Sequence, residues 1–442
     1  MKKLMVMMIA GAIFFLLAFG PSSAQDITEI GRLEGEFARA WGLAFSSDGG
    51  FAYVPGAGQT NPTVWIINTT SPSAPTLLGT IEIPNPNSQS PEAWGVKVVG
   101  NYLYVAAFKC GLWIYDITNP ISPVEKGSYT EGMESREVFV EGNYAYVADA
   151  WNGLRIFNIE NPDSPTQVAL YNTSGDLTGE NAEIHDVKVV GNYAYCAGGN
   201  LGLVIVNVTN PESPQGISYC CDKATIGEGS WGRGIDVSGN YAYLGDNNAG
   251  LRIADISDPA APYEVGSYVV GGELWKIQAI GDRAFLPYGG NFIVLNASDP
   301  ANPTEVASAQ LAGGGQAVLI KEDFAYVVTS SSLFIFDVSP YLTGVDDKEN
   351  PEALPVGYTL HQNYPNPFNP VTTIEYELAK PGWVSLKVYD MTGQQVASLV
   401  DGEVVIGLHR VNWTPTGLAS GVYFYTIAVN EFKQTRKLMF MK

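Results

Sequence analysis

Short runs of alternating apolar and polar residues recur between residues 27 and 340, and glycine, asparagine or proline bounds each run. Clear examples are YLYVAA (102–107), LWIYDI (112–117) and YAYVA (144–148). Aromatic and β-branched residues with a period of two, closed off by turn residues, are typical of β-strands. In this region no ten-residue stretch carries a convincing helical period. The pattern therefore predicts an all-β chain.

The strand signals are organised in a repeat. The segment VGNYLYVAAFKCGLWIYDITNPISP (99–123) recurs at 141–165, 190–214 and 238–262, more weakly at 280–303 and 321–340, and loosely at 46–75. One proline marks each copy, at Pro72, Pro120, Pro162, Pro211, Pro259, Pro300 and Pro340. Four strand signals in a repeat of about 40–50 residues are typical of one β-propeller blade.

We therefore predict a seven-bladed β-propeller of four-stranded blades over residues 25–341. The seventh copy ends after its third strand, LFIFDV (333–338), so its blade lacks a fourth strand. The segment ITEIGRLEG (27–35) has the pattern of that missing strand. Pairing of the two would close the ring and cover a sheet edge that would otherwise be exposed.

The third strands carry a family resemblance. LVIVNV (203–208), LRIADI (251–256), LWIYDI (112–117) and LRIFNI (154–159) resemble the LVIVD-repeat family of bacterial propellers. The resemblance is clear in four or five copies and loose in the first and sixth. It implies a propeller but little chemistry, because the family is known mainly as repeats in exported proteins.

Both ends of the chain differ from the repeats. Lys2 and Lys3, an apolar run at 9–19 and small residues before Gln25 predict a secretory signal peptide over residues 1–24. Residues 342–357 are charged and contain proline, so we expect a linker there. About seven strand signals follow in residues 358–442, which predicts a small Ig-like β-sandwich.

The C-terminal segment carries distinctive motifs, NYPNPFNPVTTIEYEL (363–378), VYDMTGQQVASL (388–399) and LASGVYFYTI (418–427). They closely resemble the C-terminal sorting domain of the type IX secretion system. The resemblance assigns a sorting motif to Asn363, Tyr364, Pro365, Asn366, Pro367, Phe368, Asn369 and Pro370. It implies recognition of residues 358–442 by an outer-membrane translocon. Export would then run through the periplasm to the cell surface or medium of a Gram-negative bacterium, and an ordinary Ig-like module is the alternative.

Charge and cysteine content exclude several classes of function. The formal net charge is −21, which argues against binding to nucleic acid or to an anionic membrane. The four cysteines, at 110, 196, 220 and 221, form no CxxC motif, and the adjacent pair could at most form a strained vicinal disulfide. Asp149 and Asp246 match no calcium-ligand spacing. We expect no metal and no cofactor.

Candidate chemistry lies just ahead of each first strand, where residues of a propeller ring the mouth of the central channel. Two positions before the first apolar residue of these strands lie Trp41, Trp94, Arg136, His185, Arg233, Trp275 and Gln316. Two positions further back, four blades carry a glutamate: Glu92, Glu134, Glu183 and Glu273. Tryptophan faces could stack on sugars or cations, and Arg or His could hold an anion. Alternatively, the tryptophans plug the channel and the arginines pair with the glutamates.

The loops on the mouth side also vary most in length, with insertions at 84–92, 172–183 and 220–230. Rigid scaffolds carry binding on variable loops, so this face is the candidate surface. The resulting hypothesis is a secreted binding scaffold with an unidentified glycan or protein ligand. One alternative is a secreted polymer-active enzyme that uses two of the glutamates at the mouth. A structural spacer is the other. No HExxH, GxSxG or P-loop motif supports catalysis.

Overall fold

The structure is a computed structural model that describes residues 25–85, 91–174, 177, 182–222, 231–342, 358–360, 363, 368, 371–378, 382–404, 407–415, 417–429 and 432–441. The predicted signal peptide, residues 343–357 of the predicted linker and parts of the three loop insertions lie outside these ranges. Within them the chain forms strands and one short helix, α2 (Ser339–Leu342). That part of the chain has no helix long and apolar enough to cross a bilayer.

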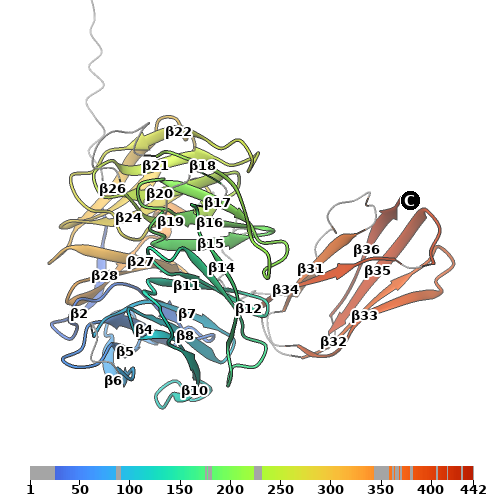
Figure 1. Cartoon of the computed structure of the whole chain (residues 1–442), viewed down its shortest axis with the longest axis horizontal. Coiled ribbons are helices and arrows are strands. Elements are labelled where there is room, and N and C mark those ends of the chain that lie inside the picture. Colours follow the sequence, from blue (N-terminus) through green and yellow to red (C-terminus); the bar gives the residue numbers. More distant parts are fainter. Residues whose placement is uncertain are drawn as a thin grey trace, which may run out of the picture.

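The described residues between 25 and 337 form six four-stranded sheets and one five-stranded sheet (Figure 1). In chain order the repeats supply β3 (Ala44–Phe45), β4 (Phe51–Gly56), β5 (Thr63–Asn68) and β6 (Thr76–Glu82); β7 (Ala93–Val99), β8 (Tyr102–Ala107), β9 (Gly111–Asp116) and β10 (Val124–Tyr129); β11 (Glu137–Glu141), β12 (Tyr144–Ala148), β13 (Leu154–Asn158) and β14 (Thr166–Tyr171); β15 (Asp186–Val190), β16 (Tyr193–Ala197), β17 (Leu203–Asn207) and β18 (Gln215–Cys220); β19 (Gly232–Ser238), β20 (Tyr241–Asp246), β21 (Gly250–Asp255) and β22 (Tyr263–Tyr268); β23 (Gln278–Ile280), β24 (Arg283–Tyr288), β25 (Asn291–Asn296) and β26 (Thr304–Gln310); and β27 (Gly315–Lys321), β28 (Phe324–Thr329) and β29 (Ser332–Asp337). Consecutive strands within each repeat pair antiparallel, so the prediction of repeated four-stranded sheets is confirmed.

The repeated turns have a local cause. Every third strand ends on Asp or Asn, whose side chain accepts the N–H two residues further on at 2.8–3.0 Å. This Asx turn lets the chain reverse before each proline. The residues that do so are Asn68, Asp116, Asn158, Asn207, Asp255, Asn296 and Asp337.

The turn between first and second strands uses left-handed backbone. In five repeats it is a glycine with φ between 54° and 60°: Gly100, Gly142, Gly191, Gly239 and Gly281. The seventh repeat has Glu322 at this position with φ 53°. A side chain with a Cβ is strained in this conformation, so one turn of the set carries backbone strain that the others avoid.

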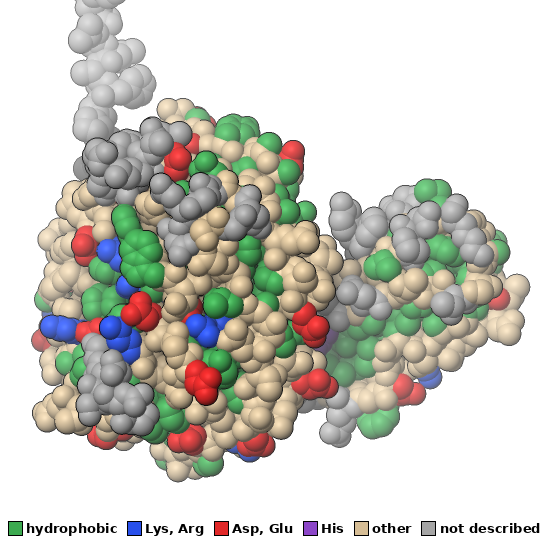
Figure 2. Space-filling model, viewed as in Figure 1, with side chains coloured by type: hydrophobic (Ala, Val, Ile, Leu, Met, Phe, Trp, Pro, Cys, Tyr) green, Lys and Arg blue, Asp and Glu red, His purple; other side chains and the backbone are tan. Residues whose placement is uncertain are grey.

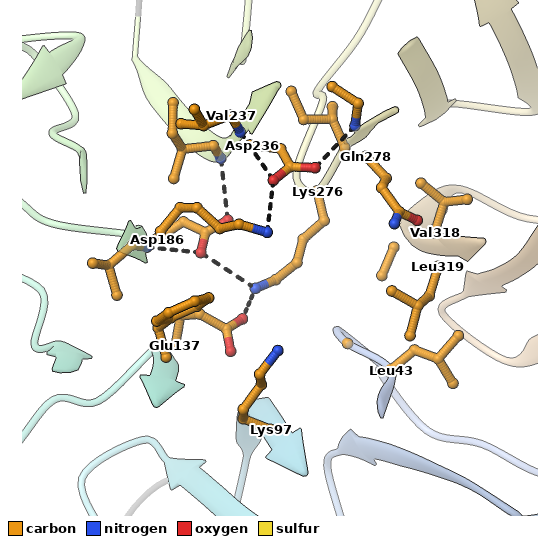
Figure 3. Close-up of a pocket in the computed structure, with 18 of the residues that line it drawn as sticks. Leu43, Lys97, Glu137, Asp186, Asp236, Val237, Lys276, Gln278, Val318 and Leu319 are labelled. Atoms are coloured by element: carbon orange, nitrogen blue, oxygen red, sulfur yellow. Dashed lines mark hydrogen bonds and ion pairs between the residues drawn. The ribbon is translucent and has the colours of Figure 1, made fainter. Parts of the chain in front are cut away.

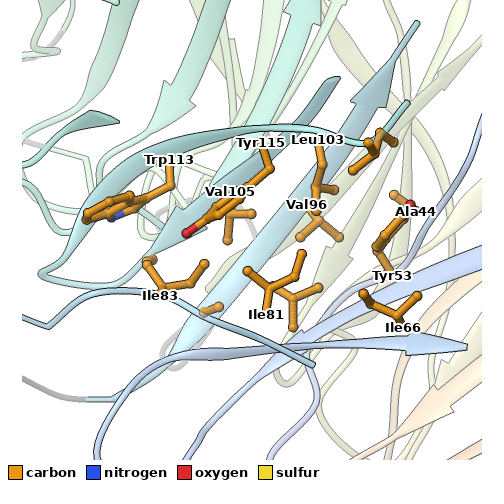
Figure 4. Packing of buried hydrophobic residues seen from close by; sticks show 14 of the residues in the cluster. Ala44, Tyr53, Ile66, Ile81, Ile83, Val96, Leu103, Val105, Trp113 and Tyr115 are labelled. Carbon is orange, nitrogen blue, oxygen red and sulfur yellow. The ribbon is translucent and has the colours of Figure 1, made fainter. Parts of the chain in front are cut away.

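Hydrophobic cores lie between sheets rather than inside them. In the first, Tyr53 and Ile66 of one sheet pack against Leu103 and Val105 of the next (Figure 4). Six further clusters join each following pair of sheets in the same way. The last of them packs Tyr326 and its neighbours against Ala52 and Val54 of the first repeat. The sheets therefore follow one another in a closed cycle.

The N-terminal strand β2 (Glu29–Glu34) completes the seventh sheet by pairing antiparallel with β29, which confirms the expectation for this segment. Its ladder has a register shift between Glu29 and Gly31, and fourth strands elsewhere carry a comparable irregularity. A Cβ on Gly31 would lie 2.3 Å from the carbonyl oxygen of Pro72 in the first repeat. Glycine thus allows the close contact that joins the two ends of the cycle. A short strand not foreseen in the sequence, β1 (Gln25–Asp26), pairs parallel with β26.

The C-terminal residues form a second group of strands, orange to red in Figure 1. One sheet contains β30 (Thr359–Leu360), β31 (Thr372–Leu378) and β34 (Gly407–Trp413), and the other contains β33 (Gln395–Val404), β32 (Gly382–Tyr389), β35 (Gly421–Val429) and β36 (Phe432–Phe440). A single core contains Ile374 and Trp413 from the first sheet and Leu386, Tyr425 and Leu438 from the second. The two sheets therefore pack face to face.

Candidate functional site

The seven candidates that stand two positions before the first apolar residue of each first strand are called the inner candidates. Several of them lie where the ladder between first and second strands begins or is irregular. Trp94, Arg233 and Gln316 each occupy a register shift between the first and second strands of their sheets. A bulge of this kind turns a side chain out of the regular alternation. Arg136 and His185 lie just before their strands and donate their backbone N–H groups to the second strand. The local backbone thus directs this repeat position toward the channel.

Six of the seven inner candidates line one cavity, which Lys276 also touches: Trp41, Trp94, Arg136, His185, Arg233 and Trp275. The cavity measures about 20 Å³. That volume holds roughly one water molecule. Gln316 is not part of the lining; its amide nitrogen lies 3.4 Å from the carbonyl oxygen of Gly314. The repeat position therefore converges at the mouth, but it fills the space rather than enclosing a pocket.

Three tryptophans make up the centre of this cluster. The rings of Trp41 and Trp94 stack at a centroid distance of 4.5 Å and an interplanar angle of 4°. Trp275 meets them at 5.3 and 5.9 Å with tilted geometry. Offset and edge contacts of this kind are the favoured arrangements of aromatic rings. All three side chains stay partly exposed, so the plug presents aromatic surface to solvent.

Two guanidinium groups extend the cluster. Arg136 lies over Trp94 at 4.8 Å from the ring centroid, and Arg233 lies over Trp275 at 4.5 Å. Such cation–π contacts strengthen as solvent is removed. Burial lowers the pKa of both arginines, and nearby carboxylates oppose the shift. Arg136 is therefore held by the face of Trp94 and by Glu183, and Arg233 by the face of Trp275 and the side-chain oxygen of Asn247.

His185 is buried beneath this layer. Its Nε2 accepts the indole N–H of Trp231 at 2.9 Å, and Nη1 of Arg233 lies 3.2 Å from Nδ1. The Glu183 carboxylate is 3.2 Å from Nε2 and also pairs with Arg136. Burial, followed by the charges of Arg136 and Arg233, outweighs Glu183 and lowers the pKa of His185 to about 4. The imidazole is neutral at pH 7.

The four glutamates are each engaged locally. Glu92 accepts hydrogen bonds from Arg39 at 2.8 Å and from the Trp94 indole at 3.2 Å. Glu273 accepts one from the Trp275 indole at 3.0 Å, and Glu134 lies 3.6 Å from the Lys109 ammonium. Burial acts to raise the pKa of Glu183, but its contact with His185 and the charges of the nearby arginines outweigh burial and lower the pKa.

Charged side chains that the sequence did not predict lie deeper in the channel. A cavity of about 130 Å³ there is lined by first strands (Figure 3). The residue just before the first apolar residue of each first strand is Gly or Ala in four repeats. In the other three repeats it is Glu137, Asp186 or Lys276. The Lys276 ammonium pairs with Glu137 and lies 3.9 Å from Asp186. Burial is the main cause that raises the pKa of Asp186 to about 7, and burial lowers the pKa of Lys276.

Several channel side chains connect neighbouring sheets. Asp186 accepts the backbone N–H of Ile235 at 3.1 Å, and Asp236 accepts that of Ala279 at 2.9 Å. In each case the donor belongs to the first strand of the next sheet. First strands are edge strands, so their outward N–H groups need such partners. The polar lining is thus largely structural. It was visible in the sequence only as polar residues inside otherwise apolar strands.

The residues considered for calcium also have structural roles. Asp149 accepts the Glu134 backbone N–H at 2.5 Å and pairs with Arg155, and Asp246 accepts the N–H of Trp231 at 2.8 Å. Each aspartate thereby ties a loop to the preceding inter-sheet connection. Over the described ranges, no three His, Cys, Asp or Glu side chains gather closely enough to hold a metal ion.

The structure describes two residues of the sorting motif, Asn363 and Phe368; the other six lie outside the described ranges. The backbone N–H of Asn363 donates to the Tyr425 hydroxyl at 2.8 Å. Phe368 is buried between Trp413 and Phe440, at centroid distances of 5.9 and 5.2 Å. These motif residues therefore pack onto the core of the C-terminal sheets.

Two family models match the sequence. The LVIVD repeat matches residues 91–131, 132–173, 183–221, 232–270 and 312–340, and the secretion system C-terminal sorting domain matches residues 362–441. The chain therefore carries five LVIVD repeats and a sorting domain, as the sequence motifs indicated. The first and sixth repeats, which resemble the family only loosely, are not matched.

Solved structures of other proteins are similar to this chain in fold. Sqt1 of Saccharomyces cerevisiae is 11% identical with a TM-score of 0.53, and covers 71% of this chain and 99% of its own. A chain of the mitotic checkpoint complex is 12% identical with a TM-score of 0.54, and covers 76% of this chain and 99% of its own. No curated protein sequence matches. At these identities the similarity concerns the fold alone.

Proposed function

We infer that this chain, which carries LVIVD repeats and a C-terminal sorting domain, is an exported seven-bladed β-propeller that binds an extracellular partner through its mouth face. The propeller spans residues 25–341, residues 342–357 link it to the sorting domain, and residues 358–442 form that domain as an Ig-like sandwich. The cyclic order of the inter-sheet cores and the pairing of β2 with β29 support the seven-bladed arrangement.

The preformed cluster of Trp41, Trp94 and Trp275 at the mouth is the observation that carries the binding proposal. Its rings and guanidinium groups already hold one another in place and remain partly exposed. A rigid aromatic surface loses little conformational freedom on binding, which favours contact with a sugar ring or a planar side chain. The cavity of about 20 Å³ beneath it admits no such ligand, so the partner would rest on the outer surface of the plug.

The electrostatics of the mouth suit binding better than catalysis. A glycosidase needs a general acid with a raised pKa, whereas the pKa of Glu183 is lowered. Glu92 and Glu273 accept hydrogen bonds from the indoles of the tryptophans beside them. On the face shown in Figure 2, basic side chains are few and interspersed with acidic ones, which agrees with a partner other than nucleic acid.

Binding is tested by probing glycan and protein arrays with the full-length protein. Trp94→Ala and Trp275→Ala should abolish the retention that the wild type shows, while circular dichroism reports an unchanged fold. Trp383→Ala provides a matched control, because this tryptophan is 59% exposed but belongs to the sorting domain. No array hit for the wild type would favour a spacer. Polymer cleavage lost in Glu→Gln variants at the mouth would favour the enzyme.

The sorting domain supports export by the type IX secretion system. In a host with that system, deletion of residues 358–442 should retain the protein inside the cell envelope. Fusion of the same residues to a reporter with a signal peptide should carry the reporter outside. Normal export of the truncated chain would contradict this assignment, whatever the propeller binds.

A further inference from the structure

Cys220 and Cys221 face each other at the end of the outer strand of the fourth repeat. Their sulfur atoms are 3.0 Å apart. Cys221 is buried in the core between the fourth and fifth sheets, whereas Cys220 is half-buried. The two thiols are therefore in contact, and one of them is accessible from solvent.

This position differs from its equivalents in other repeats. Cys220 pairs with Leu203, the first leucine of its third strand. In other repeats the residue that pairs with the equivalent leucine is a tyrosine: Tyr129, Tyr171 or Tyr268. Two of those tyrosines reach toward the following sheet. Tyr129 contacts the ring of Phe157 at 5.0 Å, and the Tyr268 hydroxyl donates to Glu305 at 2.8 Å. The fourth repeat replaces this inter-sheet contact with a pair of cysteines.

The backbone at the pair is also distinct. Cys221 has φ 60°, whereas the residue after each of the three tyrosines is not in the left-handed region. The close approach to the neighbouring loop is shared with other repeats: the carbonyl oxygen of Cys221 would lie 2.1 Å from a Cβ placed on Gly202, and that of Tyr171 would lie 2.1 Å from one on Gly153. A non-glycine residue in this left-handed conformation is strained. The local backbone thus holds the two sulfur atoms in contact at a conformation that the equivalent residues of other repeats avoid.

We propose that Cys220 and Cys221 form a vicinal disulfide after export, which fixes the turn at the end of β18. The proposal does not depend on the ligand of the mouth. Compartments outside the cytoplasm allow disulfides to persist. In the described residues the other two cysteines, Cys110 and Cys196, are buried in separate cores and offer these thiols no competing partner.

The chemistry is a thiol–disulfide exchange with an oxidant protein that carries a disulfide. The Cys220 thiolate attacks a sulfur of the oxidant's disulfide and forms a mixed disulfide. The Cys221 thiolate then attacks the Cys220 sulfur and displaces the oxidant as a dithiol. Two protons leave the cysteines, and the oxidant accepts two electrons. The hydrogen bond to Cys220 and burial raise the pKa of Cys221, which makes Cys220 the first nucleophile, and Arg252 opposes that shift.

The bond should remain reducible. Adjacent Cα atoms are about 3.8 Å apart across a trans peptide, which is shorter than the span of about 4.4–6.8 Å in ordinary disulfides. The resulting ring is strained, and strained bonds are more readily reduced. Because Cys220 is half-buried, a small dithiol reductant can reach it in the folded protein.

The test is a thiol count on the full-length protein recovered after export. A Cys110→Ala/Cys196→Ala variant retains only the adjacent pair. Under denaturing, non-reducing conditions we expect no reactive thiol in this variant and two after reduction. A further Cys220→Ser substitution should expose one thiol before reduction. Two reactive thiols before reduction, or a disulfide-linked dimer on a non-reducing gel, would overturn the proposal.

Discussion

Replacing His185 with glutamine should remove most of the acid sensitivity that the mouth gives to the folded protein. The His185 side chain is 2% exposed, and its pKa is lowered from 6.5 to about 4. One pKa unit corresponds to about 1.4 kcal/mol. A shift of this size is therefore worth about 3 kcal/mol of unfolding free energy.

The direction of the effect follows from proton binding. Between pH 6.5 and about 4 the unfolded chain binds a proton at His185 and the folded chain does not. Stability is therefore complete above pH 6.5 and is lost progressively as the pH falls to about 4. The raised pKa of Asp186 acts in the opposite direction, because the folded state then binds the proton more tightly between pH 4 and 7. Subtracting the variant from the wild type removes the Asp186 contribution, which both proteins share.

The assay is guanidinium unfolding of the full-length protein, followed by tryptophan fluorescence at several pH values from 4 to 7.5. The stability difference between wild type and His185→Gln should change by about 3 kcal/mol across this range. Glutamine can still accept the Trp231 N–H, so the fold is retained. His409→Gln in the sorting domain is the control and should leave the propeller transition unchanged. A difference that stays constant to within about 0.5 kcal/mol over the range would refute the reasoning.

Two further pairs of variants test the mouth network and the turns. Glu183→Gln should destabilise the protein by about 3 kcal/mol because it leaves buried cations without a counter-charge, whereas Glu273→Gln, in an exposed hydrogen bond, should change stability by less than about 0.5 kcal/mol. Equal losses in denaturant titrations of the two variants would contradict this. Gly100→Ala should cost about 1 kcal/mol through its positive φ alone, since nothing lies near its Cβ position, and Glu322→Gly should raise the midpoint of unfolding. A destabilising Glu322→Gly would show that the strain assigned to that turn is absent.

The sheets and their turns could be predicted from sequence because each signal is local. An Asp or Asn such as Asp116 closes its own turn, and a glycine such as Gly100 adopts the left-handed conformation without help from distant residues. The pairing of β2 with β29 joins distant residues, yet it was predictable because the last repeat lacked one strand. Strand β1 was missed because two residues carry no period.

The site was predictable only in part. Residues that share one repeat position, His185 and five other inner candidates, line the same small cavity, because equivalent positions lie at one height along the channel. Whether those side chains enclose a pocket depends on ring stacking across the channel, as between Trp41 and Trp94. The ion pair of Lys276 with Glu137 likewise joins residues from different repeats. It could not be predicted, because no local sequence pattern indicates which repeats face each other across the channel.

The placement of polar groups in the channel also bears on the proposed binding surface. Asp186 and Asp236 accept backbone N–H groups of the next first strand, so a ligand that recruited them would weaken the contacts between sheets. The tryptophans of the aromatic plug above them have a different role: the indole N–H groups of Trp94 and Trp275 donate to neighbouring glutamates and not to the next strand. Trp94 and Trp275 can therefore contact a partner without loosening the ring, provided that the contact uses the exposed faces of the plug. Under the proposed function, the backbone contacts of the first strands and the exposed aromatic faces are thus supplied by different side chains of the repeats.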